Sequence, residues 1–554
     1  MQRFLISFVL IGALALQIAP ATYAQRRDGK SAVTATASAS SARNTAEHIT
    51  AAQLKAYLEF IASDDLEGRD TPSRGLDIAA KYIASNLARW GLKPAGDAGT
   101  FFQRYTLRRN NINPSETHAQ VGEQRFTFGN DFLARARSTE TAAGSLVYVG
   151  HGWVIKSKNI NAYEGIDVRD KIMIVSGEGL PKGVTQADLG GEMGEDWSAQ
   201  DYAVKNGAKG IIQIPGYQSI ALWDRLRRNA VERGTLVVEK FQARESASIT
   251  VITPSLGMLT TLFRGEKQGG AELFRRSVAE DPGPAFDLDP KKRMSFAISV
   301  TPKQAGTQNV VAVLEGSDPV LKNEYVAIGA HYDHVGVGSA VSGDAIYNGA
   351  DDDGSGTVAT LAMAEAFARG PRPKRSLLFV WHSGEEKGLW GSRYFVEHPT
   401  VPLSGIITQL NIDMIGRSRQ AGDTKAANKE LTGPNEIYVI GSKMMSTELG
   451  QLSEAVNKSY LNLAFNYAYD DPKDPNRFFF RSDHFNYAQK GIPIIFYFDG
   501  VHEDYHRPSD SVDKIDYQKM ERVARTIFMT AWQLANTATR PPVDKQLPAE
   551  LTRR

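Results

Sequence analysis

Apolar runs of strand length recur along the second half of the chain, from Gln308 onward, and helical periodicity separates them. The runs read NVVAVLEG, YVAIGAH, SLLFVWHSG, ITQLNIDMIG, EIYVIGS and PIIFYFDG. The helical stretches lie in residues 356–370, 389–398, 442–458 and 516–536. Continuous apolar strands that alternate with helices are typical of a mostly parallel sheet. We therefore predict an α/β fold, a mostly parallel mixed sheet sandwiched by helices, over residues 306–537.

The first half of the chain has a different pattern. A helix is predicted from Thr50, with Leu54, Leu58 and Ile61 at helical spacing, and a second from about Leu76 to Trp90. Between residues 145 and 255 the runs SLVYVG, KIMIVSGEG and GIIQIPG are short, β-rich and bounded by glycine. These runs indicate a smaller β-rich domain over residues 141–260. Residues 261–305 have little pattern, and we interpret them as a return connection.

The two ends of the chain differ from its interior. Residues 1–24 combine Arg3, an apolar run from Phe4 to Leu16 and a cleavage site that ends at Ala24. This is the pattern of a secretory signal peptide, and an uncleaved N-terminal anchor is the alternative. Residues 25–46 are small and polar, which predicts a disordered linker, and residues 538–554 predict a flexible tail. A secreted or periplasmic location follows from the predicted signal.

Composition narrows the choice of function. The chain has 554 residues, of which 42% are hydrophobic and 23% charged, as in globular proteins of two or three domains. A formal net charge of +1 gives no reason to expect nucleic acid or an anionic membrane as a partner. No cysteine is present, so disulfides, thiolate metal ligands and a cysteine nucleophile are excluded. No second apolar stretch is long enough to predict stable membrane insertion.

Five potential metal ligands stand where predicted strands end or connect to helices. Two histidines and three carboxylates suit a pair of zinc ions, and ligands in such sheets bind beyond the carboxyl ends of the strands. Glu385 stands beside one of these carboxylates and is a spare acid that can activate a water molecule. The five candidates are His331, Asp352, Glu386, Asp413 and His506.

Each motif also has a structural interpretation. Asp333 lies two residues after His331 and can orient its imidazole, whereas His334 is a weaker candidate with a structural role. In the acidic run 351–353, Asp352 can bridge two cations, while Asp351 and Asp353 can be helix-start charges. Asp413 interrupts an apolar run, where an unpaired carboxylate would be costly to bury. Either a bound cation or hydrogen bonds within the core would compensate for that cost.

The segment His502–His506 spells H-E-x-x-H, a motif that binds zinc only when both histidines lie on one helix. Here Asp499-Gly500 predicts a turn before it, and Pro508 disfavours helix just after it. We therefore predict that His506 alone is a ligand.

Six motifs in this order, HYDHVG, GADDDGSG, HSGEEKGLWGS, NIDMIG, RSDHFNY and YHRPSDSVDKID, resemble those of the M28 zinc peptidases. The opening segment LEFIASDDLEGRDTPSRG resembles the N-terminal part of the same domain, which would make residues 47–140 part of the peptidase domain. Residues 141–260 are similar to the protease-associated (PA) domain inserted in some of these enzymes. The family usually has His-Thr-x-x-Asp-Thr after the last ligand. This chain has His506-Arg507-Pro508-Ser509-Asp510-Ser511 there, which keeps the His and the Asp.

The resemblance implies a role for each candidate. Asp352 would bridge two zinc ions, Glu386 and His506 would complete one site, and His331 and Asp413 the other. Glu385 would be the catalytic base and Asp333 would support His331. Asp483, with His484, would contact the ligands rather than the metal ions.

These expectations describe an exported dizinc exopeptidase, most simply an aminopeptidase that removes N-terminal residues from peptides through a zinc-bridging water activated by Glu385. A carboxypeptidase or a glutaminyl cyclase of the same fold is the alternative, with Arg477 and Arg481 as candidates to hold a free carboxylate. A non-catalytic, receptor-like relative is the alternative from a different class.

Overall fold

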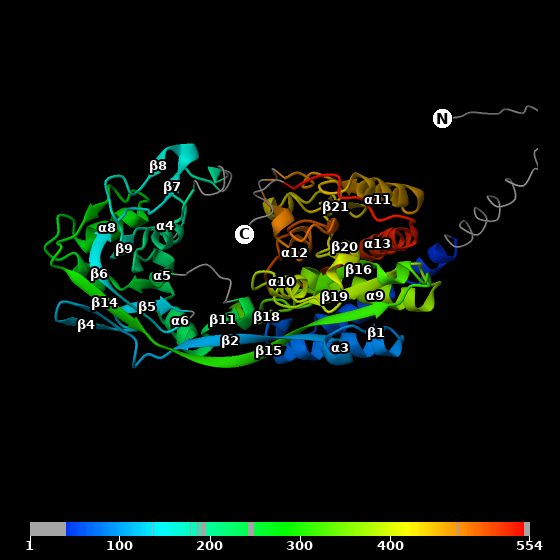
Figure 1. The fold of residues 1–554 in the computed structure, drawn as a ribbon, viewed down its shortest axis with the longest axis horizontal. Coiled ribbons are helices and arrows are strands. Elements are labelled where there is room, and N and C mark those ends of the chain that lie inside the picture. Colours follow the sequence, from blue (N-terminus) through cyan, green and yellow to red (C-terminus); the bar gives the residue numbers. More distant parts are fainter. Residues whose placement is uncertain are drawn as a thin grey trace, which may run out of the picture.

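The computed structural model describes residues 40–136, 138–177, 179–185, 188–189, 196–241, 249–472, 474 and 476–547. Two lobes are joined by the long strands β2 (Phe102–Ile112) and β15 (Val300–Leu314), which pair along the whole length of β2 and are visible along one side of the molecule (Figure 1). The predicted signal peptide and most of the predicted linker lie outside the described residues. Within the described part of that linker, residues 40–46 are helical, with Ala42 and Ala46 fully buried.

The larger lobe is built on a mixed sheet. Its strand order is β11-β2-β15-β19-β16-β20-β23-β21-β22, and the short β1 (Lys93–Pro94) pairs with β15. Neighbouring strands β19, β16, β20 and β23 run parallel, so their carboxyl ends share one edge of the sheet. The bounds are Thr235–Val238 for β11, Ser376–His382 for β19, Tyr325–His331 for β16, Ile406–Ile412 for β20, Ile494–Phe498 for β23, Glu436–Ile440 for β21 and Ala464–Asn466 for β22.

Helices cover both faces of this sheet, each over its own apolar core. Side chains alternate along the strands: Val326 and Ile328 of β16 pack into one core, and Ala327 into the other. The first face is covered by α2 (Ala51–Ile61), α3 (Arg74–Arg89), α9 (Gly356–Arg369), α11 (Thr447–Ser459) and α13 (Tyr517–Asn536). The second is covered by α10 (Trp390–Glu397) and α12 (His484–Ala488). The predicted fold class is confirmed.

The smaller lobe contains a second sheet with its own cores. Its strands extend on both sides of the predicted 141–260 insert, because β3 begins at His118 and β14 ends at Ile298. The order is β4 (Gln124–Thr127), β3 (His118–Val121), β14 (Arg293–Ile298), β6 (Glu140–Tyr148), β9 (Lys171–Val175), β10 (Gly210–Gln213), β12 (Val251–Pro254) and β5 (Phe132–Arg135). Five helices belong to the same lobe: α4 (Ala199–Asn206), α5 (Tyr217–Ala221), α6 (Trp223–Arg228), α7 (Leu256–Leu262) and α8 (Gly270–Val278).

Two hairpins complete the fold: β17 (Gly336–Val341) with β18 (Asp344–Tyr347), and β7 (Val154–Ile155) with β8 (Ile160–Asn161). The tail predicted from residue 538 is in contact where it is described, since Asp544 accepts a hydrogen bond from the Thr447 amide at 2.9 Å. Among the described residues, no helix is both long and apolar enough to cross a bilayer.

Candidate metal centre

The five predicted ligands converge at the edge where the parallel strands end. His331 is the last residue of β16, Asp413 follows β20 directly, and Glu386 lies four residues after β19. Asp352 lies in the turn 350–355 that leads into α9, and His506 lies in the loop after β23. The shared edge of parallel strands brings together residues that are up to 175 positions apart in the sequence.

Asp352 is at the centre of the cluster, and its two carboxylate oxygens face different partners. Its Oδ1 lies 3.3 Å from His331 Nε2, whereas its Oδ2 lies 3.1 Å from His506 Nε2. Asp413 Oδ1 lies 3.6 Å from the same His331 nitrogen, and Glu386 Oε2 lies 3.1 Å from the same His506 nitrogen. Two sets of donors therefore share one carboxylate, which is the arrangement that a bridged pair of cations requires.

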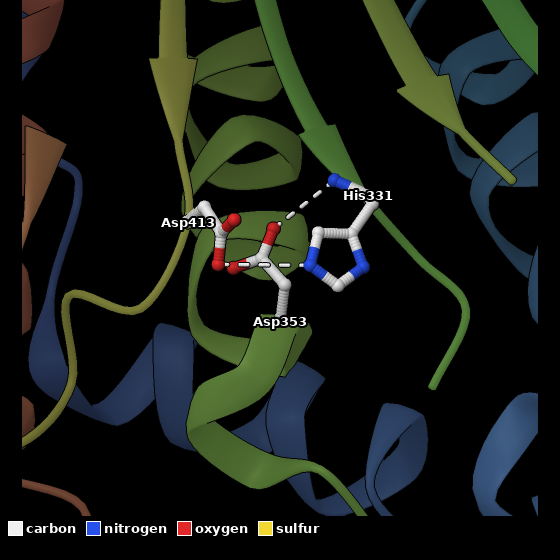
Figure 2. Close-up of side chains that lie close together, drawn as sticks. All are labelled: His331, Asp353 and Asp413. Carbon is white, nitrogen blue, oxygen red and sulfur yellow. Dashed lines mark hydrogen bonds and ion pairs between the residues drawn. The ribbon is translucent and has the colours of Figure 1, made fainter. Parts of the chain in front are cut away.

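Asp353 lies beside His331 and Asp413, but its carboxylate binds backbone amides. Figure 2 shows its carboxylate between those two residues, with one oxygen bonded to the His331 backbone. The oxygens of Asp353 accept hydrogen bonds from the amides of His331 (3.0 Å), Gly356 (2.9 Å) and Met414 (3.2 Å). Because backbone donors already occupy this carboxylate, we interpret Asp353 as a support for the ligand loops.

His334 is closer to the cluster than its predicted structural role suggests. It is fully buried, and its Nδ1 lies 2.8 Å from Glu386 Oε1 and 3.8 Å from Asp352 Oδ2. His334 therefore joins the Glu386 side of the centre as an additional donor. In the sequence, a role for His334 at the metal centre was indicated only by its position three residues after His331.

The imidazole of His331 is oriented from its own loop. Its Nδ1 lies 3.1 Å from the carbonyl oxygen of Asp333 and 3.7 Å from the carboxylate Oδ1 of that residue. The orienting contact thus comes from the main chain of Asp333 rather than from its carboxylate. Donation from Nδ1 leaves Nε2 as the nitrogen that faces Asp352 and Asp413.

Glu385 lies at the rim of the cluster, with its Oε2 3.9 Å from His331 Nε2. Its amide donates to Asp333 Oδ1 at 3.2 Å, which ties the predicted base to the His331 loop. Burial raises the pKa of Glu385 well above its ordinary value, and the charges of Glu386 and Asp413 raise it further against the effect of His331.

The Ser-Asp-His block of residues 482–484 contacts the centre through its serine. Ser482 donates to Asp413 Oδ2 at 2.6 Å. Asp483 is one step further out, with its Oδ2 3.4 Å from His382 Nδ1. The ring of His484 stacks on Phe496 at 4.5 Å between centroids. Sequence reasoning singled out Asp483 and did not identify Ser482, because a serine carries no metal-binding signal by itself.

The donor set fits a pair of zinc ions. Within the described part of the chain, the ring nitrogens of His334, the Nε2 of His506 and the Oε1 of Glu386 are buried without a hydrogen-bond partner. Burial alone would lower the pKa of His506, but the carboxylates of Asp352 and Glu386 raise it to about 10. These nitrogen and oxygen atoms face one another around Asp352 without forming hydrogen bonds, and borderline cations bind such a set of atoms.

A pocket opens beside the centre. Its polar wall is formed by His331, Asp352, Glu385 and Asp413. The rest of its lining is formed by Arg481, Tyr505 and an apolar wall of Met414, Phe478, Phe496, Phe498 and Val501. The pocket therefore joins the candidate ligands and base to a mainly apolar surface with one cation.

Comparison with known proteins agrees with this geometry. Residues 309–531 match the profile of peptidase family M28. A probable zinc metalloprotease from Pyrenophora teres f. teres is 25% identical over 60% of this chain and 72% of its own length. A probable leucine aminopeptidase 2 from Aspergillus oryzae is 30% identical, and the match spans 48% of this chain and about half (49%) of that relative.

The fold has a solved counterpart. The structure of an aminopeptidase from Aneurinibacillus sp. strain AM-1 covers 91% of this chain and 99% of its own, with 19% identity and a TM-score of 0.52. The likeness supports the fold, and the profile match confirms both the family resemblance and the class of enzyme, a metallopeptidase. Over residues 309–531, this chain is therefore similar to the peptidases of family M28.

Proposed function

We propose that the chain is an exported exopeptidase with two zinc ions, most simply an aminopeptidase with Glu385 as its base. The observation that carries the proposal is the placement of Asp352, whose two oxygens lie 3.3 Å from His331 and 3.1 Å from His506. The names of the Aspergillus and Aneurinibacillus proteins support an aminopeptidase. Export rests on the signal pattern of residues 1–24.

Asp352, Glu386 and His506, with His334 beside them, would hold one ion, and Asp352, His331 and Asp413 the other. When bound, such a pair polarises the scissile carbonyl and lowers the pKa of the attacking water. Glu385 lies within reach of the same space, so it would accept a proton from the attacking water and pass it to the leaving amine. The apolar wall around Phe478 and Phe496 would seat a hydrophobic side chain of the substrate.

Glu385→Gln tests the assignment of the base. This variant should keep two equivalents of zinc per chain, because Glu385 is not among the five ligands, and should lose activity on leucine 4-nitroanilide by about 10²–10⁴-fold. Glu397→Gln is the control, since Glu397 pairs with Arg393 outside the pocket. A Glu385→Gln enzyme as active as the control would refute the mechanism.

A carboxypeptidase is a second candidate, favoured by the position of Arg481. The side chain lines the pocket, with its guanidinium 4.9 Å from the centre of the Phe478 ring, and no carboxylate among the described residues pairs with it. Guanidinium groups bind carboxylates well, so Arg481 is placed to hold a free C-terminus.

Two substrates and two variants separate the candidates. An aminopeptidase should cleave leucine 4-nitroanilide and ignore an N-acetylated peptide, and Arg481→Gln should change its kcat/KM little. A carboxypeptidase should show the reverse preference and lose at least about 10-fold in Arg481→Gln. Arg477→Gln is the matched control, because Arg477 lies over the Phe480 ring and does not line the pocket.

A further inference from the structure

The N-terminal segment Arg69–Thr71 reaches the metal centre from outside the region that matches the family profile. It follows a tight turn in which Glu67, Gly68 and Arg69 have φ of 47°, 66° and 50°. Left-handed backbone is strained at non-glycine residues, so the surrounding packing must hold this turn in place. A Cβ on Gly68 would lie only 2.3 Å from the Tyr347 carbonyl oxygen, so the turn packs directly against the β17–β18 hairpin.

The side chain of Arg69 is fully buried and bonds to main-chain carbonyls rather than to a carboxylate. Its Nε donates to Tyr332 at 2.9 Å, and its two Nη atoms donate to Asn348 at 2.7 Å and to Gly349 at 3.0 Å. A further bond reaches the carbonyl of Ile61 at the end of α2. One rigid guanidinium therefore joins α2 to two loops of the larger lobe.

Those two loops carry the candidate ligands His331 and Asp352, together with His334. Tyr332 lies between His331 and His334, and Gly349 lies three residues before Asp352. The backbone of Arg69 adds a contact of its own, because its carbonyl accepts from the His334 amide at 3.3 Å. One side chain thus bonds to both loops, beside the direct bond between the Asp353 carboxylate and the His331 amide.

Thr71 connects the same region to the predicted base. Its hydroxyl donates to Asp333 Oδ2 at 3.0 Å and accepts from the Gly384 amide at 3.0 Å. Gly384 directly precedes Glu385, whose own amide donates to the other oxygen of Asp333. Asp70, between the two, pairs with Lys387 at 2.6 Å.

We infer that Arg69 and Thr71 are positioning residues of the metal centre: Arg69 sets the distance between the His331–His334 loop and the Asp352 loop, and Thr71 places Glu385 relative to His331. The inference rests on the proposed function, because it concerns the same ions and the same base. It adds that residues 309–531 alone lack groups that the centre needs.

Thr71 is tested by removing its hydroxyl without changing its shape. Thr71→Val should lower kcat by about 10–100-fold, with KM little changed, because the Glu385 loop loses its anchor. Thr71→Ser keeps the hydroxyl and should restore most of the activity. Thr360→Val is the matched control, since Thr360 is buried in α9 and its hydroxyl has no hydrogen-bond partner among the described residues.

Arg69 is tested by its effect on metal affinity. Arg69→Lys keeps the charge but loses the planar fork, and should weaken zinc binding, measured by competition with a chromophoric chelator, by about 10–100-fold. The control is Arg375→Lys. Arg375 is equally buried and donates to the carbonyls of Leu534 and Thr537, away from the candidate ligands. Arg375→Lys should lower thermal stability and leave zinc affinity unchanged.

The outcomes separate this inference from the proposed function. A wild-type chain that binds no zinc and cleaves no peptide refutes the proposed function. A wild-type chain that binds two zinc ions, with Thr71→Val as active as Thr360→Val and Arg69→Lys binding zinc as tightly as Arg375→Lys, refutes only the positioning role. If all four variants lose stability and none changes in kcat or zinc affinity, the positioning role is refuted as well.

Discussion

His484 is a buried imidazole that faces aromatic rings instead of a metal ligand. Its ring stacks on Phe496 and meets Phe479 edge-on at 5.6 Å. Burial lowers the pKa of His484 to about 3, against the opposing effects of the Phe479 backbone and of Asp483. The folded state therefore holds this side chain neutral, whereas the unfolded chain protonates it near pH 6.5.

This difference predicts a pH-dependent loss of stability that His484→Phe should remove. A depressed pKa in the folded state contributes stability above pH 6.5 that is lost as pH falls from 6.5 towards 3. By pH 5.5 the loss from this one residue is about 1.4 kcal/mol. Urea unfolding of the chelator-treated protein at pH 7.5 and 5.5 measures it.

Wild type should lose about 1.4 kcal/mol more between the two pH values than His484→Phe does. The exposed His48 serves as the control position, and His48→Phe should behave like wild type. An equal drop in wild type and His484→Phe would contradict the assignment of a neutral, buried imidazole.

Among single residues, the sequence predicted the histidines and carboxylates that can bind a metal ion. His331 and Asp413 stand at strand ends, and a parallel sheet brings such ends together wherever they lie in the chain. Ser482 and Thr71 could not be predicted. Their contacts with Asp413 and Asp333 join residues 69 and 262 positions apart, through loops whose path the hydrophobic pattern does not determine.

Helices α9 and α13 pack against each other, and α9 follows the Asp352 loop directly. α9 begins at Gly356, four residues after Asp352, and Phe367 near its other end stacks on Phe528 of α13 at 3.9 Å. Both rings are essentially inaccessible to solvent. The start of α9 is thus held by a contact about three turns away.

Phe367→Ala should therefore cost about 3–5 kcal/mol of unfolding free energy, because it opens a cavity between two packed helices. Urea denaturation measures the loss, and Phe60→Ala, at a position 36% exposed, should cost far less. Zinc content should stay at two equivalents well below the melting temperature, since no ligand is touched. A loss below about 1 kcal/mol would show that the stacked pair does not anchor α9.

Element boundaries were predicted best where periodicity is strong. The run YVAIGAH coincides with β16, and the predicted Thr50 cap accepts a hydrogen bond from the Gln53 amide at the start of α2. The segment 503–506 forms a turn rather than a helix. His502 consequently faces Asp351 at 3.3 Å, while His506 faces Asp352. The long pairing of β2 with β15 was not foreseen, because strand partners depend on the path of the chain between them.

At the scale of the whole molecule, the two lobes bury separate cores. The cores around Ile328 and Val380 belong to the large sheet, and those around Ile174 and Met173 belong to the small one. Among the described residues, a further small cluster that includes Tyr105, Leu107 and Tyr394 lies beside β2. Lobes with separate cores and a narrow connection are expected to unfold separately.

Removal of metal should then affect one lobe only. The carboxylates of Asp352, Glu386 and Asp413 converge in the larger lobe, and without cations they repel one another. Zinc at about a thousand times its dissociation constant would stabilise that lobe by about 4 kcal/mol. For a domain of this size, the melting temperature should change by roughly 10 °C.

Scanning calorimetry with and without chelator is the measurement. We expect two transitions, of which the one that belongs to the larger lobe moves down by roughly 10 °C in chelator and returns when zinc is restored. The transition of the smaller lobe should not move, because none of the candidate ligands lies in residues 118–298. In Asp413→Asn the chelator-sensitive shift should shrink, since one donor of the His331 side is weakened. A single transition that shifts as a whole would mean that the β2–β15 connection couples the lobes, and that the smaller lobe also senses metal at the centre.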